Sequence, residues 1–247
     1  MTEQDYIFPK TYKCPCCNNE FKNPTMRSNK ARLIGQDADL RPIYKDIDPL
    51  KYDVVLCPQC GYAALTRYFD KITTPQVKLV RAGISSKYTP REFDSIIDYS
   101  DAYLRHQLAL GNAIVKRSRA SEKAYICLKT AWILRGYAEQ LTDPESGDQA
   151  VTDETLAELK RDEAEFLNKA YEGFTEARQN EVPPICGMDN VTIDYLVACL
   201  AYKTGDRETA AKILSSVLVK QGVGKHIKDL ARGLKDKIIE DIKGQKA

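Results

Sequence analysis

The chain has 247 residues, 43% of them apolar, and a formal net charge of +2. This composition argues against disorder along the whole chain, because it supplies enough apolar residues for a sizeable core, and no stretch approaches the ~20 apolar residues that span a bilayer. Residues 1–10 include Glu3 and Asp5 and lack the apolar run of a signal peptide. We therefore expect a cytoplasmic protein that does not bind membranes. Its eight cysteines should be thiols or metal ligands rather than disulfides.

The first 65 residues carry five of the eight cysteines among turn residues and short β-like runs. Residues 54–56 (Val-Val-Leu) are β-branched and apolar and lead directly into Cys57, which predicts a strand. Residues 12–13 (Tyr-Lys) predict a corresponding strand before Cys14. Residues 23–51 are polar and are interrupted by prolines and a glycine, so we expect no long helix between the two strands.

Two Cys-x-x-Cys pairs, Cys14 with Cys17 and Cys57 with Cys60, are the strongest chemical signal in the sequence. Two residues between cysteines let one tight turn direct both sulfur atoms at a metal ion, and zinc prefers four thiolate ligands in a tetrahedron. Gly61 follows the second pair, where a positive φ is often needed. The pattern predicts one structural zinc ion held by all four cysteines.

The two pairs are separated by 39 residues, more than the ~15–20 residues of a minimal ribbon. We interpret residues 1–65 as a zinc-ribbon-like domain with a polar insertion between its two metal-binding turns. Two alternatives stay open: a redox dithiol, which would need only one pair, and a catalytic zinc, which normally keeps one position for water. Cys16 is interpreted as a spare thiol, although it could replace a neighbouring ligand.

Charged and aromatic side chains crowd the insertion. They are Arg27, Lys30, Arg32, Asp37, Asp39, Arg41 and Tyr44. In one interpretation they form a polar site for a small molecule beside the zinc, which an enzyme could use. In the other they belong to a solvated loop with internal ion pairs.

Residues 66–89 are interpreted as a connector and residues 90–247 as a helical domain. Thr89, with Pro90 and Glu92 after it, is typical of a helix start. The apolar periodicity predicts further helices over residues 121–140, 153–179, 192–203, 207–220 and 225–243. Asp206 is expected to cap one of them. The last has one apolar face, as the end of a helical stack requires because its outer side meets water.

Two segments match the spacing of tetratricopeptide repeats, in which small residues lie where paired helices touch. One match comprises Val197, Ala198, Ala201, Gly205, Ala210, Leu214 and Val217. The other is split between Cys127, Leu128 and Ala131 and, after an insertion at 141–155, Ala170, Phe174 and Ala177. An unrelated helical bundle is the alternative.

In such repeats the first helix of each pair lines a concave groove. The groove would present Tyr125, Lys129, Trp132, Tyr195, Tyr202 and Lys203. Aromatic and cationic side chains suit the binding of a peptide. The alternative is that Trp132 and the tyrosines belong to the core.

The N-terminal pattern resembles a bacterial family of unknown function, domain of unknown function 2225. The resemblance rests on Cys14-Pro15 with Cys17, on the charged span around Arg32, Asp37 and Asp39, on Pro49 and Tyr52, and on residues 57–63 (Cys-Pro-x-Cys-Gly-Tyr-Ala). The layout after Phe69 is also similar. The resemblance implies zinc and helical repeats, and it brings no established reaction or partner.

We thus expect a mainly α protein with a small β zinc ribbon followed by a tetratricopeptide-like helical stack. The leading functional hypothesis is an intracellular module that binds zinc and a protein partner. The second is nucleic-acid binding by the ribbon and by residues 63–120, which contain ten Lys and Arg but five Asp and Glu. The third is an enzyme that uses residues 27–44.

Overall fold

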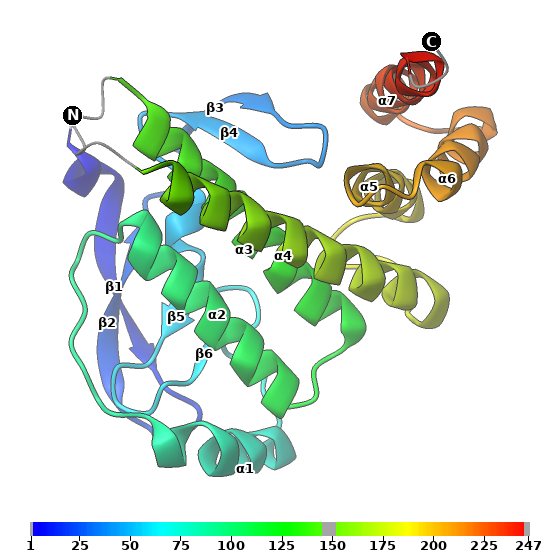
Figure 1. The fold of residues 1–247 in the computed structure, drawn as a ribbon. Coiled ribbons are helices and arrows are strands. Elements are labelled where there is room, and N and C mark those ends of the chain that lie inside the picture. Colours follow the sequence, from blue (N-terminus) through cyan, green and yellow to red (C-terminus); the bar gives the residue numbers. More distant parts are fainter. Residues whose placement is uncertain (1, 145–151, 245–247) are drawn as a thin grey trace.

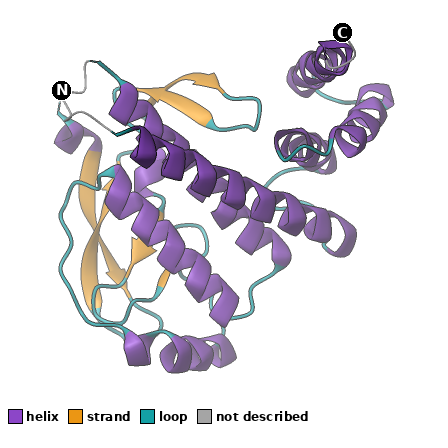
Figure 2. Cartoon of the chain, viewed as in Figure 1, coloured by secondary structure: helices purple, strands orange, loops and turns teal. Residues whose placement is uncertain are grey.

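The structure, a computed structural model, describes residues 2–144 and 152–244 and is mainly helical (Figures 1 and 2). Its α-helices are α1 Thr74–Gly83, α2 Tyr99–Val115, α3 Ala120–Thr142, α4 Asp153–Asn180, α5 Asn190–Lys203, α6 Arg207–Val219 and α7 Lys225–Gly244. Its strands are β1 Ile7–Lys13, β2 Glu20–Met26, β3 Arg32–Gln36, β4 Pro42–Lys45, β5 Val54–Leu56 and β6 Ala63–Leu65. The predicted fold class, mainly α with small strand pairs near the N-terminus, is confirmed. No helix within the described residues is long and apolar enough to span a membrane.

The strands form three separate antiparallel hairpins. The β1–β2 hairpin pairs Lys13 with Glu20, and the β5–β6 hairpin pairs Leu56 with Ala63. One Cys-x-x-Cys pair therefore lies in the turn of each of these hairpins. The third hairpin, β3–β4, lies in the insertion between the two cysteine pairs, and a short 3₁₀ helix, Pro49–Tyr52, follows it.

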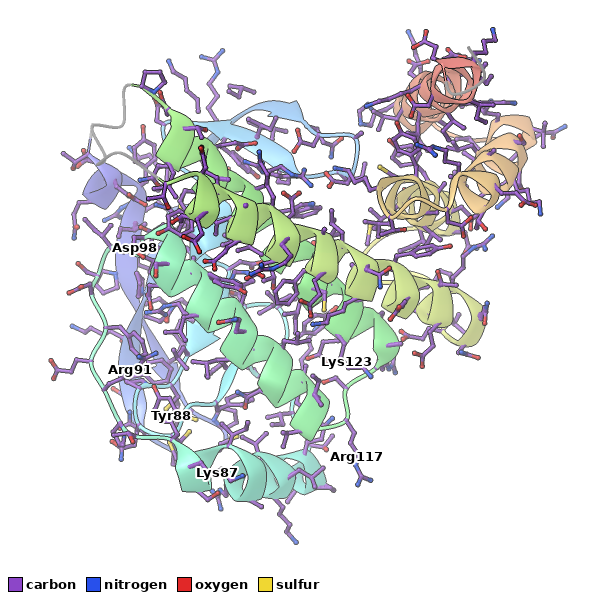
Figure 3. All side chains as sticks on the ribbon, viewed as in Figure 1. Lys87, Tyr88, Arg91, Asp98, Arg117 and Lys123 are labelled. Carbon is purple, nitrogen blue, oxygen red and sulfur yellow. The ribbon has the colours of Figure 1, made fainter. Side chains whose placement is uncertain are left out.

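Aspartates cap several of the helices. Asp206 accepts a hydrogen bond from the backbone amide of Thr209 and caps α6, as predicted. The predicted helix start at Thr89 is wrong. Helix α2 begins at Tyr99, where the Asp98 carboxylate accepts from the amide of Asp101 (Figure 3).

Residues 89–98 do not form a helix because this segment packs along the second cysteine turn. There the amide of Arg91 donates to the carbonyl of Pro58. The predicted connector, residues 66–89, contains α1. This helix has its own start signal, Thr73 with Gln76 in a capping box and Pro75 in the first turn.

The helices of the C-terminal part pack in sequence order. Helices α3 and α4 form an antiparallel pair, with Gly173 lying against Ala124, and bury the predicted Cys127, Leu128, Ala131, Ala170, Phe174 and Ala177 in one core. Helices α5, α6 and α7 share another core around Ala198, Leu214 and Ile238. In Figure 1, α5, α6 and α7 form the upper right part of the molecule. Residues 145–151 of the predicted 141–155 insertion lie outside the described residues.

The N-terminal hairpins pack directly on the helices. Val54 and Leu56 of β5 share a buried cluster with Ala109 and Ala113 of α2 and Ile126 of α3. Leu50 and Tyr52, just before β5, join the core of α3 and α4. The division into a ribbon domain, a connector and a helical domain remains a prediction, although the cores of the first and third parts are shared.

Candidate metal centre and groove

The sulfur atoms of Cys14, Cys17, Cys57 and Cys60 lie within 4.8 Å of one another. Two of these separations join the two hairpins: Cys14 Sγ to Cys60 Sγ and Cys17 Sγ to Cys57 Sγ, both 3.6 Å. A tetrahedral ion with metal–sulfur bonds of about 2.3 Å requires sulfur atoms about 3.8 Å apart. The four side chains therefore fit one four-coordinate metal ion, as the spacing of the cysteines predicts.

Each cysteine pair is shaped by the same local backbone pattern. In the first turn the amide of Cys14 donates to the carbonyl of Asn19, and the amide of Asn18 returns to the carbonyl of Cys14. In the second turn the amide of Cys57 donates to Tyr62, and the amide of Gly61 returns to Cys57. The closing residues have positive φ, 63° at Asn18 and 70° at Gly61. Glycine and asparagine adopt this conformation most readily.

Close packing adds a second requirement at Gly61. A Cβ atom there would lie 2.4 Å from the ring of Tyr88, in the segment after α1. Only glycine therefore fits, for its conformation and for its size.

An aromatic cluster and α1 cover the cysteine turns. Tyr12 packs edge-on against Phe69, and the hydroxyl of Tyr62 donates to the carbonyl of Phe69. From α1, Val80 joins the cluster and the guanidinium of Arg81 donates to the carbonyl of Cys16. The cluster is separate from the main core, so we expect a metal ion bound by the cysteines to add to its stability.

Proton sharing among the four thiols is uneven. Hydrogen bonds from Cys14 and Cys60 lower the pKa of the Cys57 thiol, while hydrogen bonds with Cys16 and Cys57 raise the pKa of Cys14. Four thiolates at this spacing need a cation to offset their mutual repulsion, so binding of a metal would release protons. Cys16 is buried, but it lies outside the group of four sulfur atoms.

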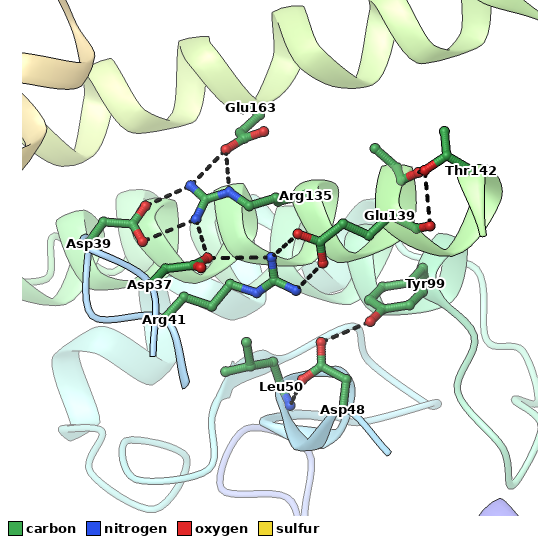
Figure 4. A network of polar contacts seen from close by, with 11 residues as sticks. Asp37, Asp39, Arg41, Asp48, Leu50, Tyr99, Arg135, Glu139, Thr142 and Glu163 are labelled. Atoms are coloured by element: carbon green, nitrogen blue, oxygen red, sulfur yellow. Dashed lines mark hydrogen bonds and ion pairs between the residues drawn. The ribbon is translucent and has the colours of Figure 1, made fainter. Parts of the chain in front are cut away.

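The polar insertion divides into an engaged part and an exposed part. Asp37, Asp39 and Arg41, in the turn of the β3–β4 hairpin, meet α3 (Figure 4). Arg27 and Arg32 are exposed and Tyr44 is half-buried; Arg27 lies over the ring of Phe8. The structure thus brings together only three of the seven predicted residues of the insertion, and Lys30 is exposed as well.

The engaged part is a network of ion pairs. Arg135 of α3 contacts Asp39 with both terminal nitrogens, at 2.6 and 3.1 Å, and Asp37 at 2.7 Å. Arg41 makes a two-pronged contact with Glu139. Asp39 is fully buried, and burial raises the pKa of its carboxyl. The hydrogen bonds and positive charges of Arg135 and Lys203 together outweigh burial and leave the pKa below its usual range.

Of the six residues predicted to bind a partner, the three on α3 are occupied within the fold. Trp132 is buried in the core with α4, and the ammonium of the buried Lys129 pairs with Asp53. Tyr125 lies between the cations of Lys129 and Arg67.

The other three predicted residues, Tyr195, Tyr202 and Lys203, belong to α5. The Tyr195 ring is buried and its hydroxyl donates to the carbonyl of Ala38, 2.7 Å away. Tyr202 donates to Asp241 of α7, and Lys203 pairs with Asp39 at 3.2 Å. All three line one groove.

This groove, of about 550 Å³, opens between α5, α7 and the turn of the β3–β4 hairpin. Besides Tyr195, Tyr202 and Lys203 it is lined by Ala38, Cys199, His226, Asp229, Leu230, Gly233, Leu234 and Lys237. The lining by α7 residues was not predicted, although the apolar stripe of α7 is visible in the sequence. That stripe was expected only to pack at the end of the helical stack.

A family described as an uncharacterized protein conserved in bacteria (DUF2225) matches residues 7–238. The chain belongs to this family. The match includes both cysteine turns, the insertion and all of the helices except the end of α7, so the family resemblance extends over nearly the whole chain. An uncharacterized protein from Borreliella burgdorferi (strain ATCC 35210 / DSM 4680 / CIP 102532 / B31) is 24% identical over 106 residues, which cover 40% of this chain and 37% of that protein. No solved structure matches the chain.

Proposed function

We propose that the chain is an intracellular, zinc-binding interaction module that receives a segment of a partner protein in the groove between α5 and α7. The groove carries the proposal. It combines an apolar lining from Leu230, Leu234 and the Tyr195 ring with a few polar groups from Tyr202 and Lys203. Binding sites commonly pair a concave apolar surface with a small number of placed polar groups.

The donor set supports zinc as the metal. Four cysteine sulfurs in two tight turns favour a soft, tetrahedral ion, and they leave no position for a catalytic water. None of the eight cysteines is in a disulfide, which fits a reducing compartment. In this role the ion stabilises the two hairpins and takes no part in a reaction.

The order of the helices supports a tetratricopeptide-like arrangement for the second part. Helices α3 and α5, the first members of two successive pairs, both contact the hairpin turn, and α7 lies on the same side. A groove on the face of the first helices is where such repeats bind peptides.

A glycine offers a direct test. Gly233 lies in α7, lines the groove and has open space where a Cβ would be. Gly233→Phe would fill the groove, and Gly111→Phe places the same side chain at another open position, on α2. Affinity purification of the tagged chain from its native host after nuclease treatment should recover a stoichiometric protein with wild type and Gly111→Phe, and lose it with Gly233→Phe. Equal recovery with all three would contradict the proposal.

Nucleic-acid binding remains a second proposal because exposed cations lie on and beside α1, next to the cysteine turns. These are Lys78, Arg81, Lys87 and Arg91. The same purification without nuclease tests it: nucleic acid would be recovered, its amount would fall steeply with salt, and Lys78→Glu would reduce it while Gly233→Phe would not. The enzyme hypothesis has less support, since Asp37, Asp39 and Arg41 are engaged in ion pairs.

A further inference from the structure

The turn of the β3–β4 hairpin contacts α3 and α5 much as a bound peptide would. The Asp39 carboxylate lies between Arg135 of α3 and Lys203 of α5. The adjacent carbonyl of Ala38 accepts from the Tyr195 hydroxyl, and Leu40 packs against the cores of both α3–α4 and α5–α7. This face of the protein thus already binds an acidic side chain flanked by an apolar one.

The groove, which Ala38 also lines, has similar features. Lys237 of α7 lies over the Tyr202 ring, with its Nζ 5.7 Å from the ring centre, and it forms no ion pair with a carboxylate of the described residues. Leu230 and Leu234 supply the apolar surface, as the cores around Leu40 do for the turn.

The charges of the lining favour a negatively charged occupant. Lys203 pairs with Asp39, but 28% of its side chain remains exposed to solvent. His226 donates to Gln36 at the rim, and Asp229, the acidic residue of the lining, is paired with Arg232 at 3.3 Å. Lys237 therefore remains as a cation without an acidic partner at an apolar surface.

We propose that the groove binds a segment of a partner protein in which an Asp or Glu lies within two residues of a leucine or an aromatic residue. This inference rests on the proposed function and specifies its partner. The acidic side chain pairs with Lys237 at the rim, and the apolar side chain packs on Leu230 and Leu234.

Selection from a random dodecapeptide library displayed on phage, with the immobilised full-length chain, tests this inference. Wild type should enrich peptides that combine Asp or Glu with Leu, Phe, Tyr or Trp. Lys237→Glu should weaken binding of a fluorescently labelled copy of the most enriched peptide by about tenfold, and a new selection on that variant should favour Lys and Arg. Lys243→Glu on the same helix, outside the groove lining, should leave the affinity within about twofold.

The possible results distinguish failure of the acidic-partner inference from failure of the proposed function. Peptides that lose binding with Gly233→Phe but show no acidic preference and no response to Lys237→Glu would overturn the acidic partner and leave the groove as a binding site. No peptide above background would contradict peptide binding itself. Self-association at high protein concentration that Gly233→Phe abolishes would overturn the inference in favour of a second copy of this chain.

Discussion

Asp39→Asn removes one negative charge from the hairpin turn and keeps the shape of the side chain. Asp39 is fully buried and contacts Arg135 and Lys203, so the substitution removes the counter-charge that these two cations share. Arg135 keeps its ion pairs with Asp37 and Glu163. Loss of one partner from a buried ion pair costs about 3–5 kcal/mol. Because asparagine retains one accepting oxygen, we expect about 3 kcal/mol, near the lower end of that range.

Asp37→Asn is the matched control. Asp37 is in the same turn and contacts the same guanidinium, but 28% of its side chain is exposed. We expect it to cost less than about 1 kcal/mol, as solvent screens the pair. In thermal unfolding followed by circular dichroism, about 3 kcal/mol corresponds to a fall of roughly 6–12 °C for a chain of this size.

The pH dependence provides a second readout of Asp39. Because the folded pKa of Asp39 lies below its unfolded value, its contribution to stability is fully present above the unfolded pKa of about 4 and is lost as the pH falls through the folded pKa. The gap between wild type and Asp39→Asn should therefore narrow below about pH 4. Equal destabilisation by Asp37→Asn and Asp39→Asn at neutral pH would contradict the argument that burial makes the ion pairs of Asp39 the stronger ones.

Three further outcomes are expected. Wild type should contain about one zinc ion per chain by elemental analysis, and Cys57→Ser should lose most of it together with thermal stability; full retention of zinc would contradict the four-cysteine site. Gly61→Ala should cost clearly more than Gly205→Ala in urea unfolding, since both have positive φ but only the former meets a side chain, the Tyr88 ring, within 4 Å of the added Cβ; similar losses would show that the ring moves aside. Gly233→Ala should raise stability by up to about 1 kcal/mol, because it replaces a glycine inside α7 and its Cβ meets open space; a loss would indicate that the groove is narrower than described.

Features with a local cause could be predicted from the sequence. The two cysteine turns follow from their spacing and from Gly61, and the cap at Asp206 follows from one side chain beside a periodic run. Two helix starts were misjudged, for different reasons. Residues 73–76 hold a complete start signal inside a segment interpreted as a connector, whereas Thr89 holds a similar signal that tertiary contacts override.

Features formed across long separations could not be predicted. Asp39 and Arg135 are 96 residues apart, and nothing in the local pattern of either residue identifies the other. Trp132 and Lys129 match the positions of groove residues in a repeat, but Trp132 is buried in the core with α4 and Lys129 is buried where it pairs with Asp53 of the N-terminal part. The groove forms instead between α5, α7 and the turn of the β3–β4 hairpin.

The insertion is held to the helices at two places. Leu50 and Tyr52 fix the chain after β4 to the main core. Asp39 fixes the turn of the β3–β4 hairpin to Arg135 and Lys203. The aromatic cluster beneath α1 is separate from that core, so loss of the metal would loosen the cysteine turns before it loosens the hairpin turn. The metal centre and the groove are therefore separable, and the charge on Asp39 should affect the shape of the groove more than the metal does.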